Sequence, residues 1–250
     1  MTTSIRKLDR KVALVTGASR SLGAAIAKRL AADGAAVALT YSSSPQKARA
    51  VVQEIETSGG KALAIKADAA DAEATRAAVA TAIQTFGSLD ILVNNAGVLA
   101  IGSIEKFALE DFDKMIAVNI RGLFVATQEA ARHMQEGGRI IHIGSCNSDR
   151  IPFPGASVYA LTKGAVAAFT KGLARDLGPR GITVNNVQPG PTDTDMNPAV
   201  GEFADLNRSF MALKRYATPG EIASFVAYLA SPDASFITGA SLLVDGGYTA

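Results

Sequence analysis

Short apolar runs alternate with amphipathic stretches along this chain, and no other feature of the sequence constrains its fold as strongly. Seven runs are expected to form strands, at residues 12–16, 37–41, 62–66, 89–93, 139–144, 182–187 and 241–244. Helical patterns lie between most of them, up to residue 33 and at residues 45–57, 71–86, 109–134, 156–177 and 218–230. Strands that are apolar throughout and separated by helices are typical of a parallel sheet covered on both faces.

This pattern predicts an α/β fold with one doubly wound, Rossmann-type domain over residues 1–250 and a seven-stranded parallel sheet. The chain has 250 residues and a formal net charge of +2, which suits a full core and gives no reason to expect nucleic acid as a partner. The single cysteine, Cys146, fits a reducing compartment. Residues 1–10 are polar and basic, and no apolar run approaches the ~20 residues of a membrane span. We predict a cytoplasmic protein without a membrane segment.

A glycine turn, TGASRSLG at residues 16–23, directly follows the first predicted strand and opens a helix. Free backbone N–H groups at such a helix start attract a pyrophosphate, although a turn of this kind alone is a weak signal. Gly17 suits a tight turn, and Gly23 lets helix and strand approach closely. The marked residues that follow later strands, such as Asn94 and Ser145, should lie at the same sheet edge, where ligands bind in doubly wound folds.

The end of the second predicted strand carries Tyr41, Ser42 and Ser43, without the acid that usually holds a ribose 2′-hydroxyl. Arg20 stands in the glycine turn, and a guanidinium suits a phosphate. We therefore expect NADP(H) rather than NAD(H). The alternative is that Arg20 is a solvated charge and the serines only start the next helix. Asp68, after the third strand, is expected beside the adenine or as a helix N-cap.

Tyr159 and Lys163 lie four residues apart in the predicted helix at 156–177, so they share one helix face. A nearby ammonium should lower the pKa of the phenol from its usual value of about 10. Such a phenol can exchange a proton near neutral pH, and beside a dinucleotide it predicts carbonyl/alcohol redox chemistry. The plainer interpretation of this spacing is a surface pair.

Together these residues resemble the short-chain dehydrogenase/reductase (SDR) family over essentially the whole chain. The resemblance rests on the glycine turn together with Asn94-Asn95-Ala96-Gly97, Asn119, Ser145, Tyr159, Lys163 and Pro189-Gly190-Pro191-Thr192. Within the family the chain looks like the 3-oxoacyl-carrier-protein reductases, and residues 138–198 more closely resemble cyclic-di-GMP-binding biofilm-dispersal proteins of the same family. One residue departs from the family pattern, because Ser21 stands where the family usually has glycine.

The resemblance implies that Tyr159 donates the proton in reduction, Ser145 hydrogen-bonds the substrate oxygen, Lys163 binds the nicotinamide ribose and Asn119 holds a relay water. It also implies a homotetramer. The expected cofactor-binding residues are Gly17, Ser19, Arg20, Ser21, Leu22, Gly23, Tyr41, Ser42, Ser43, Asp68, Ala69, Asn95, Ala96, Gly97, Tyr159, Lys163, Pro189, Gly190, Thr192 and Thr194. The expected substrate pocket comprises Cys146, Asn147, Ile151, Phe153, Met196 and Phe203, with a lid at residues 193–215.

The sequence as a whole predicts an NADPH-dependent reductase that converts a small-molecule ketone or 3-oxo substrate to a secondary alcohol. Two alternatives stay open: a nucleotide-binding regulator that senses cyclic di-GMP or NADPH, and an NAD-dependent alcohol or sugar dehydrogenase. The complete catalytic set argues against the first, and the missing acid after the second strand argues against the other. No metal site is expected, because His133 and His142 have no second ligand at suitable spacing.

Overall fold

The computed structural model describes residues 6–250. The first half of the polar and basic segment at residues 1–10 therefore lies outside the described residues. Its centre is a seven-stranded parallel sheet in the order β3-β2-β1-β4-β5-β6-β7. This order reverses direction between β1 and β4, as expected of a doubly wound α/β fold. The strands are β1 (Val12–Val15), β2 (Ala36–Tyr41), β3 (Lys61–Lys66), β4 (Ile91–Asn94), β5 (Arg139–Ile143), β6 (Thr183–Pro189) and β7 (Ser241–Val244).

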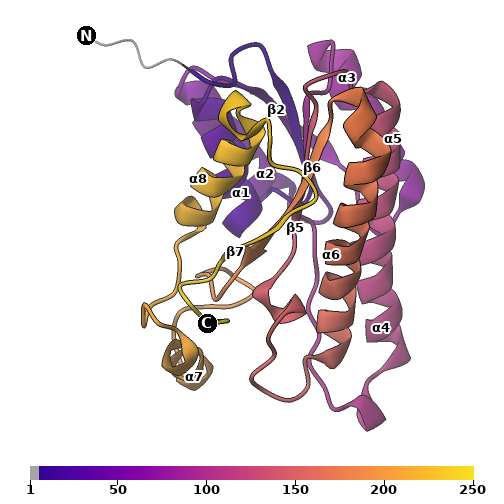
Figure 1. Ribbon diagram of the computed structural model, residues 1–250. Coiled ribbons are helices and arrows are strands. Elements are labelled where there is room, and N and C mark those ends of the chain that lie inside the picture. The colour runs from indigo at the N-terminus through magenta and orange to yellow at the C-terminus, as the bar shows by residue number, and fades with distance from the viewer. Residues whose placement is uncertain (1–5) are drawn as a thin grey trace.

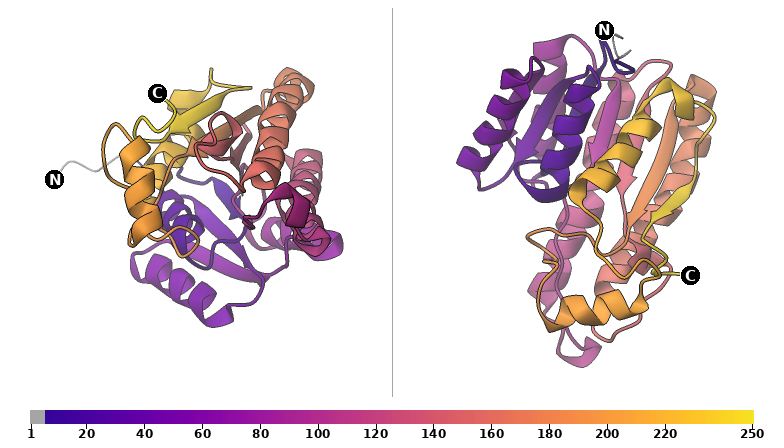
Figure 2. Two further views of the ribbon diagram at one scale, coloured as in Figure 1. Left: turned by 90° about the horizontal axis from the view of Figure 1, so that it is seen from below. Right: turned by 90° about the vertical axis from the view of Figure 1, so that its left-hand side faces the viewer.

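Helices cover both faces of this sheet, as the sequence predicted (Figure 1). On one face lie α1 (Ser21–Ala32), α2 (Pro45–Thr57) and α8 (Pro219–Ala230). On the other lie α3 (Ala72–Phe86), α4 (Leu109–Met115), α5 (Leu123–His133) and α6 (Ser157–Leu177). Another helix, α7 (Glu202–Phe210), lies beyond the carboxyl edge of the sheet, apart from both layers (Figures 1 and 2).

Successive side chains of β1 point to opposite faces of the sheet, and each face is packed. Val15 belongs to a buried cluster with residues of α1 and α8, including Ile26 and Val226. Its neighbour Leu14 belongs to a second buried cluster with residues of α3, α5 and α6, including Val79. Because both faces are dry, the strand is apolar at every position, and burial of each large side chain stabilises the fold by about 1.5–3 kcal/mol.

Two segments differ from the sequence-based prediction. The helix expected over residues 109–134 is interrupted at Ile116–Gly122, where the backbone widens to a π-helix between α4 and α5. The predicted lid at residues 193–215, where no helix was expected, contains α7. Helix α7 has only nine residues, and Pro198 and Gly201, which are typical of loops, stand directly before it.

Within residues 6–250, no helix is long and apolar enough to cross a membrane. In the same range, no three His, Cys, Asp or Glu side chains come together as a metal site would require.

Candidate functional site

The glycine turn joins β1 to α1 at the carboxyl edge of the sheet. Gly17 has a φ of +64°, a conformation that favours glycine, and its N–H donates to Thr40 Oγ1 at 2.9 Å. A Cβ added to Gly23 would lie 2.5 Å from Asn95 Nδ2 and 2.7 Å from the carbonyl oxygen of Gly17. Both glycines therefore have the roles predicted for them: one makes the turn and the other permits close packing.

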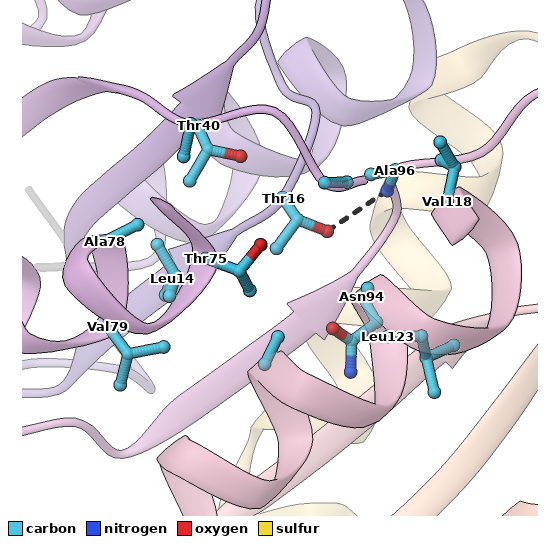
Figure 3. A pocket seen from close by; sticks show the side chains of 14 residues that line it. Leu14, Thr16, Thr40, Thr75, Ala78, Val79, Asn94, Ala96, Val118 and Leu123 are labelled. Carbon is cyan, nitrogen blue, oxygen red and sulfur yellow. Dashed lines mark hydrogen bonds between the residues drawn. The ribbon is translucent and has the colours of Figure 1, made fainter. Parts of the chain in front are cut away.

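Hydrogen bonds connect the residues that follow β4 to this turn. Thr16 Oγ1 accepts from the backbone N–H groups of Asn95 and Ala96 at 3.0 and 3.1 Å, and Figure 3 shows the second of these bonds. The Asn95 side-chain amide donates to the carbonyl oxygens of Thr16 and Gly17. Behind these bonds lies a cavity of about 10 Å³, lined among others by Thr16 after β1, Thr40 of β2 and Thr75 of α3, which has room for a single water. Asn95 thus acts mainly on the shape of the turn.

Ser21 begins α1 in a left-handed conformation, with a φ of +49°. A side chain in this region costs about 1 kcal/mol or more, which agrees with glycine being the usual residue here in the family that the sequence resembles. The hydroxyl oxygen of Ser21 accepts a hydrogen bond from the backbone N–H of Asp195 at 3.2 Å. The residue that departs from the family pattern therefore contacts the predicted lid.

The residues expected around the adenosine lie at the ends of β2 and β3. Tyr41 is half-buried, whereas Ser42 and Ser43 are exposed. Asp68 accepts from the N–H of Ala70 at 2.9 Å, and Asp71 is the N-cap of α3 instead. Of the two roles weighed for Asp68, the N-cap role is therefore wrong.

Ala69, the other residue expected beside the adenosine, packs against the π-helix. A Cβ on Gly122 would lie 2.2 Å from the carbonyl oxygen of Ala69. This close approach connects the predicted adenosine site to the helix that carries Asn119.

Tyr159 and Lys163 face one another within α6. The ammonium nitrogen of Lys163 lies 5.6 Å from the centroid of the Tyr159 ring and donates to the carbonyl oxygen of Ile143 at 2.8 Å. Lys163 is 94% buried in relative terms, with 6% of its surface exposed, and Tyr159 is half-buried. A Cβ on Gly97 would lie 3.8 Å from the same ammonium, so the end of β4 reaches the pair. The alternative interpretation of Tyr159 and Lys163 as a surface pair is therefore wrong.

Burial changes the acid–base properties of this pair in a way that the sequence did not suggest. Burial raises the pKa of Tyr159 to about 12, and a hydrogen bond with Ser145 offsets only part of that effect. The expected lowering of the Tyr159 pKa by Lys163 is therefore wrong, because loss of solvent sets the direction of the shift. Burial also lowers the pKa of Lys163 to about 8.

Asn119 lies in the π-helix, where the widened backbone brings its side chain toward β4 and α6. Its Oδ1 accepts from the N–H of Val98 at 2.8 Å, and its Nδ2 donates to the carbonyl oxygen of Val98 at 2.9 Å. The same Nδ2 lies 3.2 Å from Thr162 Oγ1, which donates to the carbonyl oxygen of Tyr159. Asn119 therefore connects the chain after β4 to the helix of the Tyr159–Lys163 pair. Local departures from α-helix of this kind are frequent at functional sites.

Ser145 immediately follows β5 and begins a short turn. Its hydroxyl accepts from the N–H of Asn147 at 3.1 Å, which leaves the hydroxyl hydrogen free to donate. Cys146 is buried against Met211 and Tyr248, and burial raises the pKa of its thiol to about 12, so the thiol is not reactive at neutral pH.

The remaining predicted residues lie on loops at the same edge. Phe153, before α6, meets Phe203 of α7 edge-on, with ring centroids 5.3 Å apart. Ile151 and Met196 are largely exposed. Gly190, after Pro189, packs against Asp245, since an added Cβ would lie 2.6 Å from the Asp245 Cα. Thr192 Oγ1 donates to the Gly190 carbonyl and Thr194 closes a small turn with Asn197.

The structure also brings together residues that the sequence did not single out. Thr162 connects Asn119 to α6. Asp195 forms ion pairs with both Arg20 and Lys47. Lys47 could have been found, because it is a cation in the first turn of the helix that follows β2. Nothing in the sequence connects Asp195 to Arg20 or Lys47, which lie about 150 or more positions earlier.

The residues present fit a dinucleotide. Within the described part of the chain the ammonium of Lys163 donates to one acceptor, so two further donors can meet ribose hydroxyls beside Gly97. A doubly wound sheet with a glycine turn at its reversal point, and a Tyr–Lys pair at its edge, defines a nucleotide-dependent oxidoreductase fold.

Comparison with known proteins agrees with this class. The family model described as enoyl-(acyl carrier protein) reductase matches residues 17–249. A short-chain dehydrogenase/reductase from Serratia marcescens has 62% sequence identity, with a TM-score of 0.97 over 98% of this chain and 100% of that one. A short-chain dehydrogenase from Burkholderia cenocepacia in complex with NADP has 54% identity, with a TM-score of 0.96 over 98% and 100% of the two chains.

Among curated proteins, the cyclic-di-GMP-binding biofilm dispersal mediator protein of Escherichia coli is 47% identical over 96% of this chain and 98% of its own length. The chain therefore belongs to the short-chain dehydrogenase/reductase family, and it is an oxidoreductase of that family.

Proposed function

We propose that this protein is an NADPH-dependent reductase that converts a ketone or 3-oxo substrate to a secondary alcohol. The observation that carries the proposal is the convergence of Ser145, Tyr159, Lys163 and Asn119 at the carboxyl edge of the sheet. Residues 1–250 would act as one domain, with residues 193–215 as the lid over the substrate.

When bound, the nicotinamide supplies a hydride to the carbonyl carbon. Tyr159 supplies the proton to the carbonyl oxygen, and its raised pKa keeps the phenol protonated for this task throughout the neutral range. Ser145 donates a hydrogen bond to the same oxygen and orients it. Lys163 binds the nicotinamide ribose and brings positive charge to the Tyr159 ring. Asn119 holds the loop after β4 against α6, which supports the role that the family resemblance implies for it, that of holding a water that relays a proton.

The proposal of NADP(H) rather than NAD(H) rests on two cations at the adenosine end. Arg20 and Lys47 lie near the end of β2, where no carboxylate follows the strand to hold a ribose 2′-hydroxyl. The complex of the Burkholderia cenocepacia relative with NADP supports this assignment.

Apolar side chains on the loop before α6 and on the predicted lid support a substrate with apolar substituents on its carbonyl carbon. The Phe153–Phe203 contact joins the loop before α6 to the lid, so opening of the lid separates the two rings. Ile151 and Met196 are exposed at the same entrance. We infer that the pocket is completed only when the lid closes over a bound substrate.

The assembly proposed for the protein is a homotetramer in the cytoplasm. Large apolar side chains are exposed on the helical layer of α4 to α6, including Leu109, Phe124 and Leu161. Exposed apolar surface on a soluble enzyme favours closed symmetric assembly. Sedimentation as a monomer at micromolar concentration would refute this proposal.

A second candidate function is suggested by the Escherichia coli relative, which is described as binding cyclic di-GMP. On this hypothesis the chain would use the same fold to sense a nucleotide. The complete Ser145, Tyr159 and Lys163 set favours an enzyme, because a sensor has no need of a proton donor.

The experiment that separates the two is a turnover assay with a panel of β-keto esters, diketones and secondary alcohols, with NADPH or NADP⁺, alongside titration with cyclic di-GMP. The proposal predicts oxidation of NADPH that depends on the ketone. Binding of cyclic di-GMP without turnover of any panel member would select the regulatory function instead.

A further inference from the structure

Asp195, a carboxylate of the predicted lid, pairs with the two cations at the predicted adenosine end of the site. Asp195 Oδ2 is 3.3 Å from Arg20 Nη1 and 3.7 Å from Lys47 Nζ. The backbone N–H of Asp195 also donates to Ser21 Oγ at 3.2 Å. Two cations and a hydroxyl, from the glycine turn and from α2, therefore converge on one residue of the predicted lid.

This cluster lies where doubly wound folds bind the 2′ substituent of the adenosine ribose. Arg20 lies in the turn between β1 and α1, and Lys47 in the first turn of α2, directly after the end of β2. In doubly wound folds the residues after β2 select the 2′ substituent. The two cations also line an open groove of about 460 Å³ between α1 and α2, which leaves room for an anion beside them. An anion held here by both cations is the chemistry that a 2′-phosphate requires.

We propose that Asp195 is a specificity-determining residue that occupies the 2′-phosphate subsite until the cofactor displaces it. This inference rests on the proposed use of NADP(H) and adds to it Lys47 as a second phosphate-binding cation and Asp195 as an internal competitor. A ligand that carries a 2′-phosphate gains both cations and breaks the contacts of Asp195. A ligand with a free 2′-hydroxyl offers no charge with which to displace the carboxylate.

The exposure of these side chains limits how much Asp195 can change the affinity for a 2′-phosphate. The side chains of Arg20, Lys47 and Asp195 are each more than half exposed, at 57%, 57% and 53%, so solvent and salt screen both ion pairs. Removal of the Asp195 charge should therefore change affinity for a 2′-phosphate by a few-fold rather than by orders of magnitude. The effect should be greatest at low ionic strength.

The test is calorimetric titration of the full-length protein with adenosine 2′,5′-bisphosphate and, separately, with 5′-AMP. Asp195→Asn should lower the Kd of the bisphosphate at least threefold and leave that of 5′-AMP unchanged. Lys47→Met should raise the Kd of the bisphosphate at least threefold, again without effect on 5′-AMP. Asp205→Asn is the matched control, because it removes the same charge from the same lid at a carboxylate paired with Arg208, away from the cluster.

Several outcomes would overturn the inference. An unchanged or raised Kd of the bisphosphate in Asp195→Asn refutes the competitor role, and it leaves NADPH-dependent reduction standing if the ketone panel is turned over. An equal gain in Asp205→Asn would mean that only the overall charge matters. Failure of the bisphosphate to bind any of the proteins would refute both this inference and the proposed cofactor.

Discussion

Replacement of Lys163 by methionine should stabilise the protein while it abolishes function. Burial lowers the pKa of Lys163 from 10.5 to about 8. Each tenfold change in proton affinity corresponds to about 1.4 kcal/mol, so the folded state carries a cost of about 3 kcal/mol for holding this ammonium at neutral pH. The substitution removes that cost, but it also removes the hydrogen bond to Ile143, which contributes about 1 kcal/mol. The net gain at pH 7 should be about 1–2 kcal/mol.

The pH dependence of this gain is its most specific signature. Below pH 8 Lys163 is protonated in both the folded and the unfolded protein, so the full cost is present. Between pH 8 and 10.5 the unfolded state binds more protons, and the stability of the native protein rises with pH. The advantage of Lys163→Met should therefore shrink steadily over this interval.

The assay is urea unfolding of both proteins from pH 7 to 10.5, with Lys171→Met as the control, because Lys171 is an exposed lysine of the same helix. The reasoning is refuted if Lys163→Met is less stable than the native protein at pH 7. It is also refuted if the difference between the two proteins does not depend on pH.

Two further predictions follow from the geometry of the site. Because burial raises the pKa of Tyr159 to about 12, kcat/KM for alcohol oxidation with NADP⁺ should rise with pH up to pH 8, where Lys163 begins to lose its proton, while ketone reduction stays flat over the same range; oxidation that does not rise below pH 8 would contradict this. Gly23→Ala should weaken NADPH binding and destabilise the fold by about 1–3 kcal/mol, because its Cβ would overlap Asn95 Nδ2; unchanged binding and melting temperature would contradict the packing argument.

Much of the fold could be predicted from the sequence because its signals are local. The run 241–244 and the helix at 45–57 were placed with the bounds that the structure has, since apolar runs, proline and glycine mark their ends. Gly17 and Gly23 were likewise predictable, because both stand in a glycine turn directly after the first strand.

What the sequence could not give depends on burial and on distant contacts. The pKa of Tyr159 is set by the loss of solvent around α6, which spacing within a helix does not report, so the predicted direction was wrong. The π-helix around Asn119 follows α4 and continues into α5 without a gap, so nothing in the sequence marks its two ends. The contact between Asp195 and Arg20 joins two loops that only the folded sheet brings together.

The central claim, that Tyr159 is the proton donor of a carbonyl reductase, is tested most directly by Tyr159→Phe, assayed in parallel for ketone reduction and for NADPH binding. Loss of a positioned general acid should reduce kcat by about two to four orders of magnitude. The Kd for NADPH should stay within about threefold of the native value, because the ring and Lys163 remain in place. Turnover close to that of the native protein, with NADPH still bound, would contradict the account.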